Sequence, residues 1–300
     1  MKTVSYCALA LCLFSTLLLA PPPLRAQAQS GDWNVAVLDQ ILARTRPGQK
    51  LVQVGDMEIL VTNLTVWRDE IAGAGGPVPQ SAFENGAPTW TDGNVYYTFS
   101  TSGTNAVPEN FQQAFLDAAA EWATFANLHF IPRTTQSNYV TVQVNGGLEG
   151  GQSAVGMVGG QQFLSVGPYA WNRGTLCHEI GHALGLVHEH QRSDRDSHVA
   201  ILTNNIVSGG IGNFVLLPNS LNQGAYDFLS VMHYARNYLA GPETSGFGSS
   251  NASALDTIVT LPAYTNYIDI MGEPGPVVLS DGDRAGMAAI YGPDRATVPW

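Results

Sequence analysis

A short stretch near the middle of the chain carries the side chains with the clearest chemical potential. It contains His178, Glu179 and His182 in the pattern His-Glu-x-x-His. Two residues four positions apart on a helix lie about 40° apart on one face, so both imidazoles can reach one metal ion while the Glu179 carboxylate lies beside its open position. Gly185 can adopt a positive φ that ends the helix and brings His188 to the same ion. Three neutral nitrogen ligands with an open position are typical of catalytic rather than structural zinc.

A helix with incidental histidines is the alternative interpretation of this stretch. The short pattern HExxH arises by chance, so alone it leaves both interpretations open. The longer pattern HExxHxxGxxH fixes five positions, each with its own mechanical requirement. The longer pattern therefore favours a metal site.

The motif extends further and resembles the signature of the astacin family of metzincin zinc endopeptidases. The family pattern HExxHxxGxxHExxRxDRD is matched in full by His178, Glu179, His182, Gly185, His188, Glu189, Arg192, Asp194, Arg195 and Asp196. Downstream, the segment 230–234 (Ser-Val-Met-His-Tyr) resembles the family's Met-turn, and Leu279-Ser280 with Asp283 resembles its C-terminal signature. The resemblance covers about residues 81 to 293.

The resemblance implies a role for each residue of the motif. His178, His182 and His188 would hold one Zn²⁺, and Glu179 would act as the general base that takes a proton from water. Tyr234 matches the family's additional zinc ligand, which stabilises the oxyanion of the tetrahedral intermediate; a packed core tyrosine is the alternative. Met232 would form the floor beneath the ion without binding it. The three imidazoles by themselves do not select zinc among divalent ions.

Two further residues are expected to connect the site to activation. In the family, the residue at Glu189 pairs with the amino terminus that propeptide removal creates; an ion pair with Arg192 or Arg195 is the alternative here. Family propeptides block the zinc with the aspartate of an FxGD motif, and Asp56 follows Gly55 with Gln53 in place of the Phe. Asp56 is therefore expected to take the place of the water in a zymogen, and an exposed Gly-Asp turn is the alternative.

The amino-terminal segment predicts export. Lys2, the apolar run from Tyr6 to Ala20 and the small-x-small site at Ala26-Gln27-Ala28 indicate a signal peptide over residues 1–28 and a secreted protein. A triple proline after the run leaves it too short to span a membrane, and no later stretch is long and apolar enough. The exported part then has one cysteine, Cys177, and no possible intramolecular disulfide, although family members commonly have two. A small buried residue is favoured over a redox or metal role for Cys177.

The remaining sequence predicts two parts and an α+β fold. Residues 29–80 are expected to form a propeptide that ends in a Gly/Pro-rich linker at 73–79, and residues 81–300 the astacin-like catalytic domain. Hydrophobic periodicity predicts helices near 33–42 and 108–126 and strands near 57–61, 95–100, 128–131, 140–144 and 163–166, followed by an irregular second half. The resemblance implies a metzincin-type catalytic domain: an amino-terminal twisted sheet with packed helices including the zinc helix, an irregular carboxy-terminal subdomain, and a cleft between them.

The composition limits the partners. The chain has 13 Lys and Arg against 24 Asp and Glu, a formal net charge of −11, which argues against nucleic acid as a partner. The expected substrates are proteins or peptides, and the sequence does not indicate an oligomeric state. A non-catalytic, zinc-stabilised peptide-binding protein and a hydrolase of small non-protein substrates are the rival functions. Glu179 disfavours the first, because a pure binder needs no base beside the metal, and the length of the motif disfavours the second.

Overall fold

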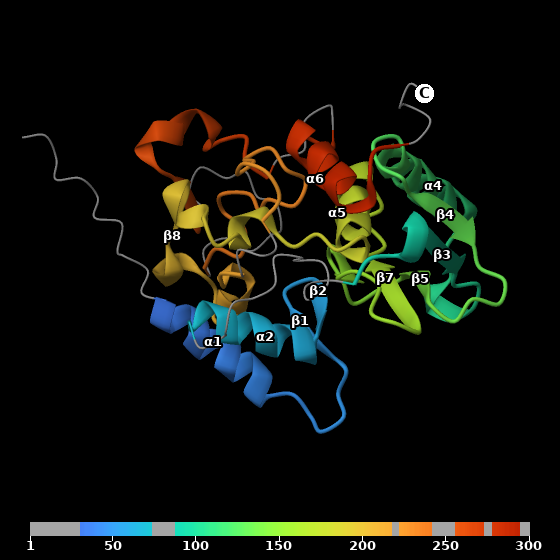
Figure 1. The fold of residues 1–300 in the computed structure, drawn as a ribbon, viewed down its shortest axis with the longest axis horizontal. Coiled ribbons are helices and arrows are strands. Elements are labelled where there is room, and N and C mark those ends of the chain that lie inside the picture. The colour runs from blue at the N-terminus through green and yellow to red at the C-terminus, as the bar shows by residue number, and fades with distance from the viewer. Residues whose placement is uncertain (1–30, 74–87, 218–221, 242–255, 273–277, 295–300) are drawn as a thin grey trace, which may run out of the picture.

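The main feature of the computed structural model is a seven-stranded mixed sheet (Figure 1). The structure describes residues 31–73, 88–217, 222–241, 256–272 and 278–294. Within them the strand order of this sheet is β1-β2-β6-β7-β5-β3-β4. The strands are β1 (Leu51–Val54), β2 (Met57–Leu60), β3 (Asn94–Phe99), β4 (His129–Pro132), β5 (Tyr139–Val144), β6 (Gly151–Ala154) and β7 (Gln161–Val166).

The sheet is built from two segments that are far apart in the sequence. Strands β7, β5, β3 and β4 pair in parallel, and β6 runs antiparallel to β7 at the edge. The β1-β2 hairpin then extends this edge, because β2 pairs in parallel with β6 through Met57↔Ser153 and Glu58↔Ala154. The segment expected to be a propeptide therefore contributes two strands to the sheet of the later segment.

Two long helices cover the sheet and form the larger core. They are α4 (Glu109–Ala123) and α5 (Arg173–Ala183). Phe115 and Trp122 of α4 pack with Leu176 and Ile180 of α5, and Trp122 Nε1 donates a hydrogen bond of 3.0 Å to the Cys177 carbonyl. The apolar spacing predicted the first of these helices, and the structure confirms it. This packing fixes the position of α5 along its axis and its rotation about that axis. Helix α5 carries the first two histidines of the motif.

A smaller amino-terminal unit packs on the β1-β2 hairpin. Helix α1 (Gly31–Ala43) and helix α2 (Val61–Ile71) bury Leu38, Leu64 and Trp67 against the hairpin and against Leu217 of the later segment. The helix near 33–42 and the strand near 57–61 are confirmed. Strand β1 and helix α2 were not predicted from the sequence. The β-branched residues of α2 have weak helix propensity, and burial of Leu64 and Trp67 decides its conformation.

The chain after the zinc helix is largely irregular, as expected. Among the described residues after α5, the regular elements are a two-stranded pair, β8 (Val199–Ile201) with β9 (Ile258–Thr260), and helix α6 (Asp281–Tyr291). Short 3₁₀ helices occur there at Glu189–Gln191, Arg195–Ser197, Thr203–Asn205, Ile211–Phe214 and Pro262–Tyr267, and before α5 at Thr91–Gly93 and Gly103–Asn105. A sheet with packed helices followed by an irregular half is the α+β arrangement that the sequence predicted.

The described helices include none with the length and apolar character that crossing a membrane requires. The predicted signal peptide at 1–28 and residues 74–79 of the predicted linker lie outside the described residues.

Candidate active site

Helix α5 and the turn that follows it bring three histidines together. The helix begins after Asn172, whose side chain accepts a hydrogen bond of 3.0 Å from the Thr175 amide. His178 and His182 lie one turn apart with ring centroids separated by 4.6 Å. Gly185 has a φ of 110°, so the predicted positive φ is confirmed, and the chain turns sharply. The turn places the His188 ring 5.3 and 4.8 Å from the other two.

The β1-β2 hairpin places Asp56 in the middle of these histidines. Its Oδ1 lies 2.9 Å from His188 Nε2 and 3.7 Å from His182 Nε2, and its Oδ2 lies 3.4 Å from His178 Nε2. The turn needs Gly55, whose φ is 69° and whose Cα packs so closely on the Asn213 side chain that a Cβ would lie 2.3 Å from Asn213 Oδ1. The turn is therefore directed into the site and not into solvent.

The hydrogen bonds of the three imidazoles fit a metal ion. Each Nδ1 has a partner: the Val231 carbonyl for His178 (2.7 Å), the Leu186 carbonyl for His182 (2.9 Å) and Gln191 Oε1 for His188 (2.8 Å). A carbonyl oxygen accepts only from a protonated Nδ1, so the free lone pair is on Nε2. All three Nε2 atoms are buried and face the Asp56 carboxylate, with no other protein partner, and together with an Asp56 oxygen they lie within 4.8 Å of one another. Three converging imidazole nitrogens of this kind are the donor set of a zinc site.

Glu179 lies beside the cluster and is almost fully buried. Its Oε2 has no hydrogen-bond partner, and burial, followed by the negative charge of Asp56, raises the pKa of this carboxyl well above its usual range. Burial also opposes ionisation of Asp56, but the His188 charge and the polar contacts of the three histidines hold its pKa well below its usual range. The Glu179 carboxylate packs on Gly151 of β6, where a Cβ would lie 2.3 Å from Oε1.

The Met-turn supports the cluster from below. Met232 is buried, and its sulfur lies 2.8 Å from the position that a Cβ on Gly181 would occupy. The preceding residue, Val231, holds His178 through its carbonyl and donates its own amide to Asp283 Oδ2 at 2.9 Å. Asp283 also accepts a hydrogen bond of 2.6 Å from Ser230 Oγ. The carboxylate of α6 thus fixes the turn that positions the first histidine.

Tyr234 borders the cluster but its hydroxyl is engaged elsewhere. Its ring centroid is 4.5 Å from that of His188 and 4.0 Å from that of His190, on which it stacks. The hydroxyl donates to Asn213 Oδ1 at 3.2 Å, next to Gly55 of the hairpin. Tyr234 thus lies beside the site, with its hydroxyl held by Asn213.

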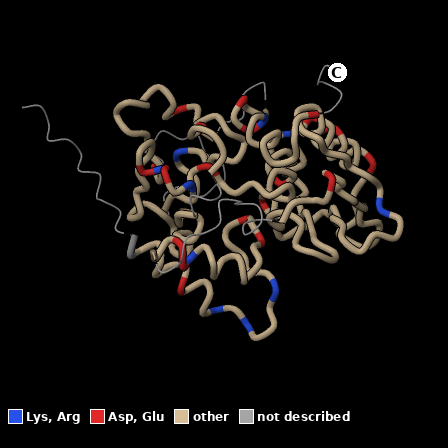
Figure 2. Tube along the Cα trace, viewed as in Figure 1, with Lys and Arg blue, Asp and Glu red and all other residues tan. Residues whose placement is uncertain are grey.

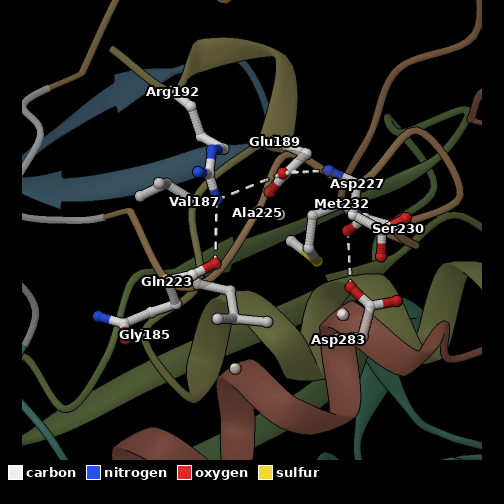
Figure 3. A pocket seen from close by; sticks show the side chains of 13 residues that line it. Gly185, Val187, Glu189, Arg192, Gln223, Ala225, Asp227, Ser230, Met232 and Asp283 are labelled. Atoms are coloured by element: carbon white, nitrogen blue, oxygen red, sulfur yellow. Dashed lines mark hydrogen bonds and ion pairs between the residues drawn. The ribbon is translucent and has the colours of Figure 1, made fainter. Parts of the chain in front are cut away.

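Glu189 lies beside a separate small cavity (Figure 3). Its Oε1 accepts a hydrogen bond of 2.8 Å from the Asp227 amide and lies 3.5 Å from Arg192 NH1. The Arg195 guanidinium pairs instead with Asp196 and donates to the His190 and Phe214 carbonyls. Burial raises the pKa of the Glu189 carboxyl to about 8. The cavity has a volume of about 50 Å³, enough for a few waters.

Comparison with known proteins identifies the family. Residues 82–291 match the family model for astacin, a family of peptidases. The chain belongs to the astacin family of metzincin zinc endopeptidases. Zinc is accordingly the metal that fits the histidine cluster of this astacin.

Individual relatives agree with the family match. The astacin-like metalloendopeptidase of Coturnix japonica is 36% identical over 180 residues, which are 56% of this chain and 41% of the relative. Bone morphogenetic protein 1 of Xenopus laevis is 34% identical over 211 residues, 67% of this chain and 27% of the relative. Each of these two matches thus covers less than half the length of the curated relative. The solved structure of high choriolytic enzyme 1, a hatching enzyme zinc-protease from Oryzias latipes, superposes with a TM-score of 0.57 at 25% identity, over 70% of this chain and 95% of that chain.

Two residues of this site, Gln191 and Gly151, were not singled out from the sequence. Gln191 holds His188, and Gly151 leaves room for Glu179. Gln191 could have been found from its position three residues after His188. Gly151 reaches the site only through the fold, and no local pattern marks it. The pair Asn213-Phe214 resembles a pair in the family, but its sequence does not indicate that Asn213 holds Tyr234. Cys177 is fully buried with its Sγ 3.7 Å from Glu121 Oε2, as a packed residue of the helix interface.

Proposed function

We propose that this chain is the secreted zymogen of a zinc endopeptidase that hydrolyses protein or peptide substrates. One observation carries the proposal. The three Nε2 atoms of His178, His182 and His188, all inside the segment that matches the astacin model, converge on the Asp56 carboxylate, with no other protein partner, beside the buried Glu179 carboxylate. A peptide-binding protein has no need of a buried carboxylate beside an open metal position.

The catalytic roles follow from the chemistry of the side chains. Zn²⁺ held by three imidazoles would supply Lewis-acid polarisation of the scissile carbonyl and lower the pKa of water. Glu179 would take the proton of the attacking water at Oε2 and deliver it to the leaving amine. The Val231 carbonyl, the Leu186 carbonyl and Gln191 keep each imidazole in the Nδ1-protonated form, so that Nε2 stays a lone-pair donor.

Tyr234 would complete the site once the hairpin has left. Its ring already packs on the His188 ring. Its hydroxyl donates a hydrogen bond to Asn213, on the side of the site where the hairpin lies. A phenolic hydroxyl beside the scissile carbonyl can donate to the oxyanion of the tetrahedral intermediate. Met232 would serve as the soft floor under Gly181, packing without binding the ion.

Latency would come from Asp56. Its carboxylate lies between the three Nε2 atoms, where the water must be for hydrolysis, and β2 occupies the β6 edge beside it. Activation then requires a cut near residue 81 and loss of residues 29–80. We assign Glu189 as the partner of the new amino terminus, because its buried carboxylate lines a cavity next to Arg192 and the Met-turn. The predicted signal peptide at 1–28 would deliver the zymogen outside the cell.

The proposal is tested with the processed protein and a quenched peptide substrate. Cleavage is expected, with loss of activity on chelation and recovery on addition of Zn²⁺. Glu179→Gln should lower kcat by at least about 100-fold, the size of a general-base contribution. Glu149→Gln, the same chemical change on an exposed residue, should leave kcat unchanged. Equal cleavage by the Glu179→Gln protein would reject the mechanism. Metal-dependent peptide binding by the parent without any cleavage would favour the peptide-binding alternative.

A further inference from the structure

The apolar core under the β1-β2 hairpin includes side chains of the later segment. Val155, Val215 and Leu217 are buried in it, and Val187 packs against it. The other buried members of this core belong to the amino-terminal unit and include both buried residues of β2. Loss of residues 29–80, as proposed for activation, would therefore uncover these four side chains, which we call the covered patch. A contiguous apolar patch that is open to solvent usually marks a binding surface.

The covered patch adjoins the histidine cluster. Val187 directly precedes His188 in the chain. The Leu217 amide donates a hydrogen bond of 2.7 Å to the Gln191 carbonyl, and Gln191 Oε1 holds the His188 ring at 2.8 Å. The backbone that carries the patch is therefore tied to the turn that carries the third histidine, so a ligand at the histidines can reach the patch.

Departure of the hairpin would also free the edge of strand β6. The Ser153 amide donates to the Asp56 carbonyl at 3.0 Å, and the Val155 amide donates to the Glu58 carbonyl at 2.9 Å. In the processed chain both N–H groups would be available to another strand. An open strand edge binds an extended peptide through the main chain, while neighbouring pockets select its side chains.

Strand β2 shows that an extended chain with one group at the histidines can fill the patch. Met57 directly follows Asp56, pairs with Ser153 and is fully buried in the core of the patch. Ile59, three residues after Asp56, is buried in the same core. The patch therefore accepts apolar side chains within three residues of the position that the zinc-bound group would occupy.

The direction of the substrate decides which side of the scissile bond the patch serves. Strand β6 begins at Gly151, on which the Glu179 carboxylate packs, and leads into Val155 of the patch. Antiparallel pairing is slightly more stable per residue than parallel pairing, so we expect a substrate to run from Val155 towards Gly151. Its scissile bond then lies beside Glu179, and the residues before that bond lie over the patch.

We infer that the covered patch is a specificity subsite of the processed peptidase and takes an apolar side chain within the three residues that precede the scissile bond. Val155, Val215 and Leu217 would be its specificity-determining residues. The inference rests on the proposed function and adds to it a class of substrate: extended peptides with an aliphatic side chain shortly before the cleaved bond.

The first test compares two quenched peptides built around a bond that the processed enzyme cuts. They are identical except for Leu or Asn at the second and third residues before that bond, and mass spectrometry confirms that both are cut at the same place. The Leu peptide should have a kcat/KM at least about tenfold higher than the Asn peptide, the usual size of discrimination by an apolar pocket.

The second test changes the patch. Val155→Thr keeps the shape of the side chain but adds a hydroxyl, and it should reduce the ratio of the two kcat/KM values by at least about threefold. Leu217→Gln is a second variant with the same expectation. Val144→Thr makes the same change at a buried position of β5 outside the patch and should keep the parent ratio. Loss of folded protein lowers both kcat/KM values equally, so the ratio reports specificity and not stability.

The third test measures binding without turnover. Labelled forms of the two peptides are titrated into the processed Glu179→Gln protein and followed by fluorescence anisotropy. The Leu peptide should bind with a Kd at least about tenfold lower than the Asn peptide, and Val155→Thr in this background should reduce the difference.

The outcomes separate this inference from the proposed function. Cleavage of both peptides with equal kcat/KM, or a preference for Leu that both patch variants keep, overturns the inference and leaves the peptidase intact. Tighter binding of the Leu peptide by a processed parent that cleaves no peptide supports the patch and rejects the peptidase. Neither cleavage nor a difference in binding overturns both.

Discussion

At the scale of single residues, what distinguishes the three motif histidines is which ring nitrogen is satisfied. His178, His182 and His188 bond through Nδ1, and their Nε2 atoms face the Asp56 carboxylate with no other protein partner. His190 is equally buried but bonds through Nε2 to the Asn213 carbonyl. His233 bonds through both nitrogens, to the Tyr234 carbonyl and the Tyr226 hydroxyl. Burial and sequence proximity alone would therefore not separate ligands from packed histidines, whereas the hydrogen bonds do.

Asp56→Ala in the full-length chain should raise peptide hydrolysis or self-processing. Polar contacts to charged groups contribute about 1.5–3 kcal/mol each, so losing one is expected to increase the open population by roughly ten- to a hundredfold. Glu58→Gln is the matched control, because Glu58 lies on the same hairpin and pairs with Gln152 at 3.2 Å. Both variants are assayed with a quenched peptide before any processing. No gain over Glu58→Gln would remove Asp56 from the latency mechanism.

Gly151→Ala should lower kcat of the processed enzyme with little change in folding. The φ of Gly151 is not in the left-handed region, so an alanine adds no backbone strain, but its Cβ would lie 2.3 Å from Glu179 Oε1. A displacement of about 1 Å at a catalytic group can cost roughly 100-fold in rate. Gly146→Ala, with nothing within 4 Å, is the control. A variant with the parent kcat would show that Glu179 does not depend on this space.

The motif predicted that His178, Glu179, His182 and His188 lie together, as they do in the structure, whereas the contacts that position them were not predictable. Their spacing alone places His178, Glu179 and His182 on one helix face, and Gly185 predicts the turn that leads to His188. Gly151 of strand β6 leaves space for the Glu179 carboxylate. The Asn213 side chain accepts a hydrogen bond from the hydroxyl of Tyr234, which is 21 residues further along the chain. The contribution of both residues depends on tertiary proximity, which no local pattern encodes.

At the scale of elements, the amino-terminal end of α6 stabilises the Met-turn. Ser280 caps the helix by accepting from the Asp283 amide at 2.9 Å, while Asp283 accepts from the Ser280 amide at 3.0 Å. The same Asp283 carboxylate holds Ser230 and Val231. The Asp283 side chain therefore both caps α6 and supports the turn that holds His178.

Ser280→Ala should lower the free energy of unfolding by about 1 kcal/mol, the usual cost of losing an N-cap side chain. The measurement is a urea titration in the Glu179→Gln background, which prevents self-digestion. Ser280→Thr keeps a hydroxyl cap and should recover most of the stability. If the alanine and threonine variants unfold at the same urea concentration, the capping hydroxyl does not contribute.

The elements themselves were predictable in part. Helices α1 and α4 and strands β2, β3, β4, β5 and β7 follow the hydrophobic periodicity of the chain. Strand β6 contains Gly, Gln, Ser and Ala, and only its pairing with β2 and β7 makes it a strand. Helix α2 likewise depends on burial of Leu64 and Trp67. Tertiary contacts override local propensity in both cases.

At the scale of the whole molecule, the charge distribution (Figure 2) predicts a preference for basic substrates. From Ser81 onward the chain has no lysine, and five of its arginines are paired with carboxylates: Arg173, Arg192, Arg195, Arg236 and Arg284. Ion pairing cancels most of the positive field, so the unpaired carboxylates dominate at a distance.

A basic peptide should therefore be cleaved with a kcat/KM that falls as salt rises. Screening shortens the reach of surface charge from about 30 Å at 0.01 M salt to about 3 Å at 1 M, so attraction is lost over this range. A neutral peptide with the same residues at the scissile bond should show a flat profile, and an acidic one should improve with salt, because like charges are screened. Measuring all three peptides at matched pH separates attraction from a general salt effect on the enzyme. Three parallel profiles would mean that the net charge of −11 plays no part in substrate capture and serves solubility alone.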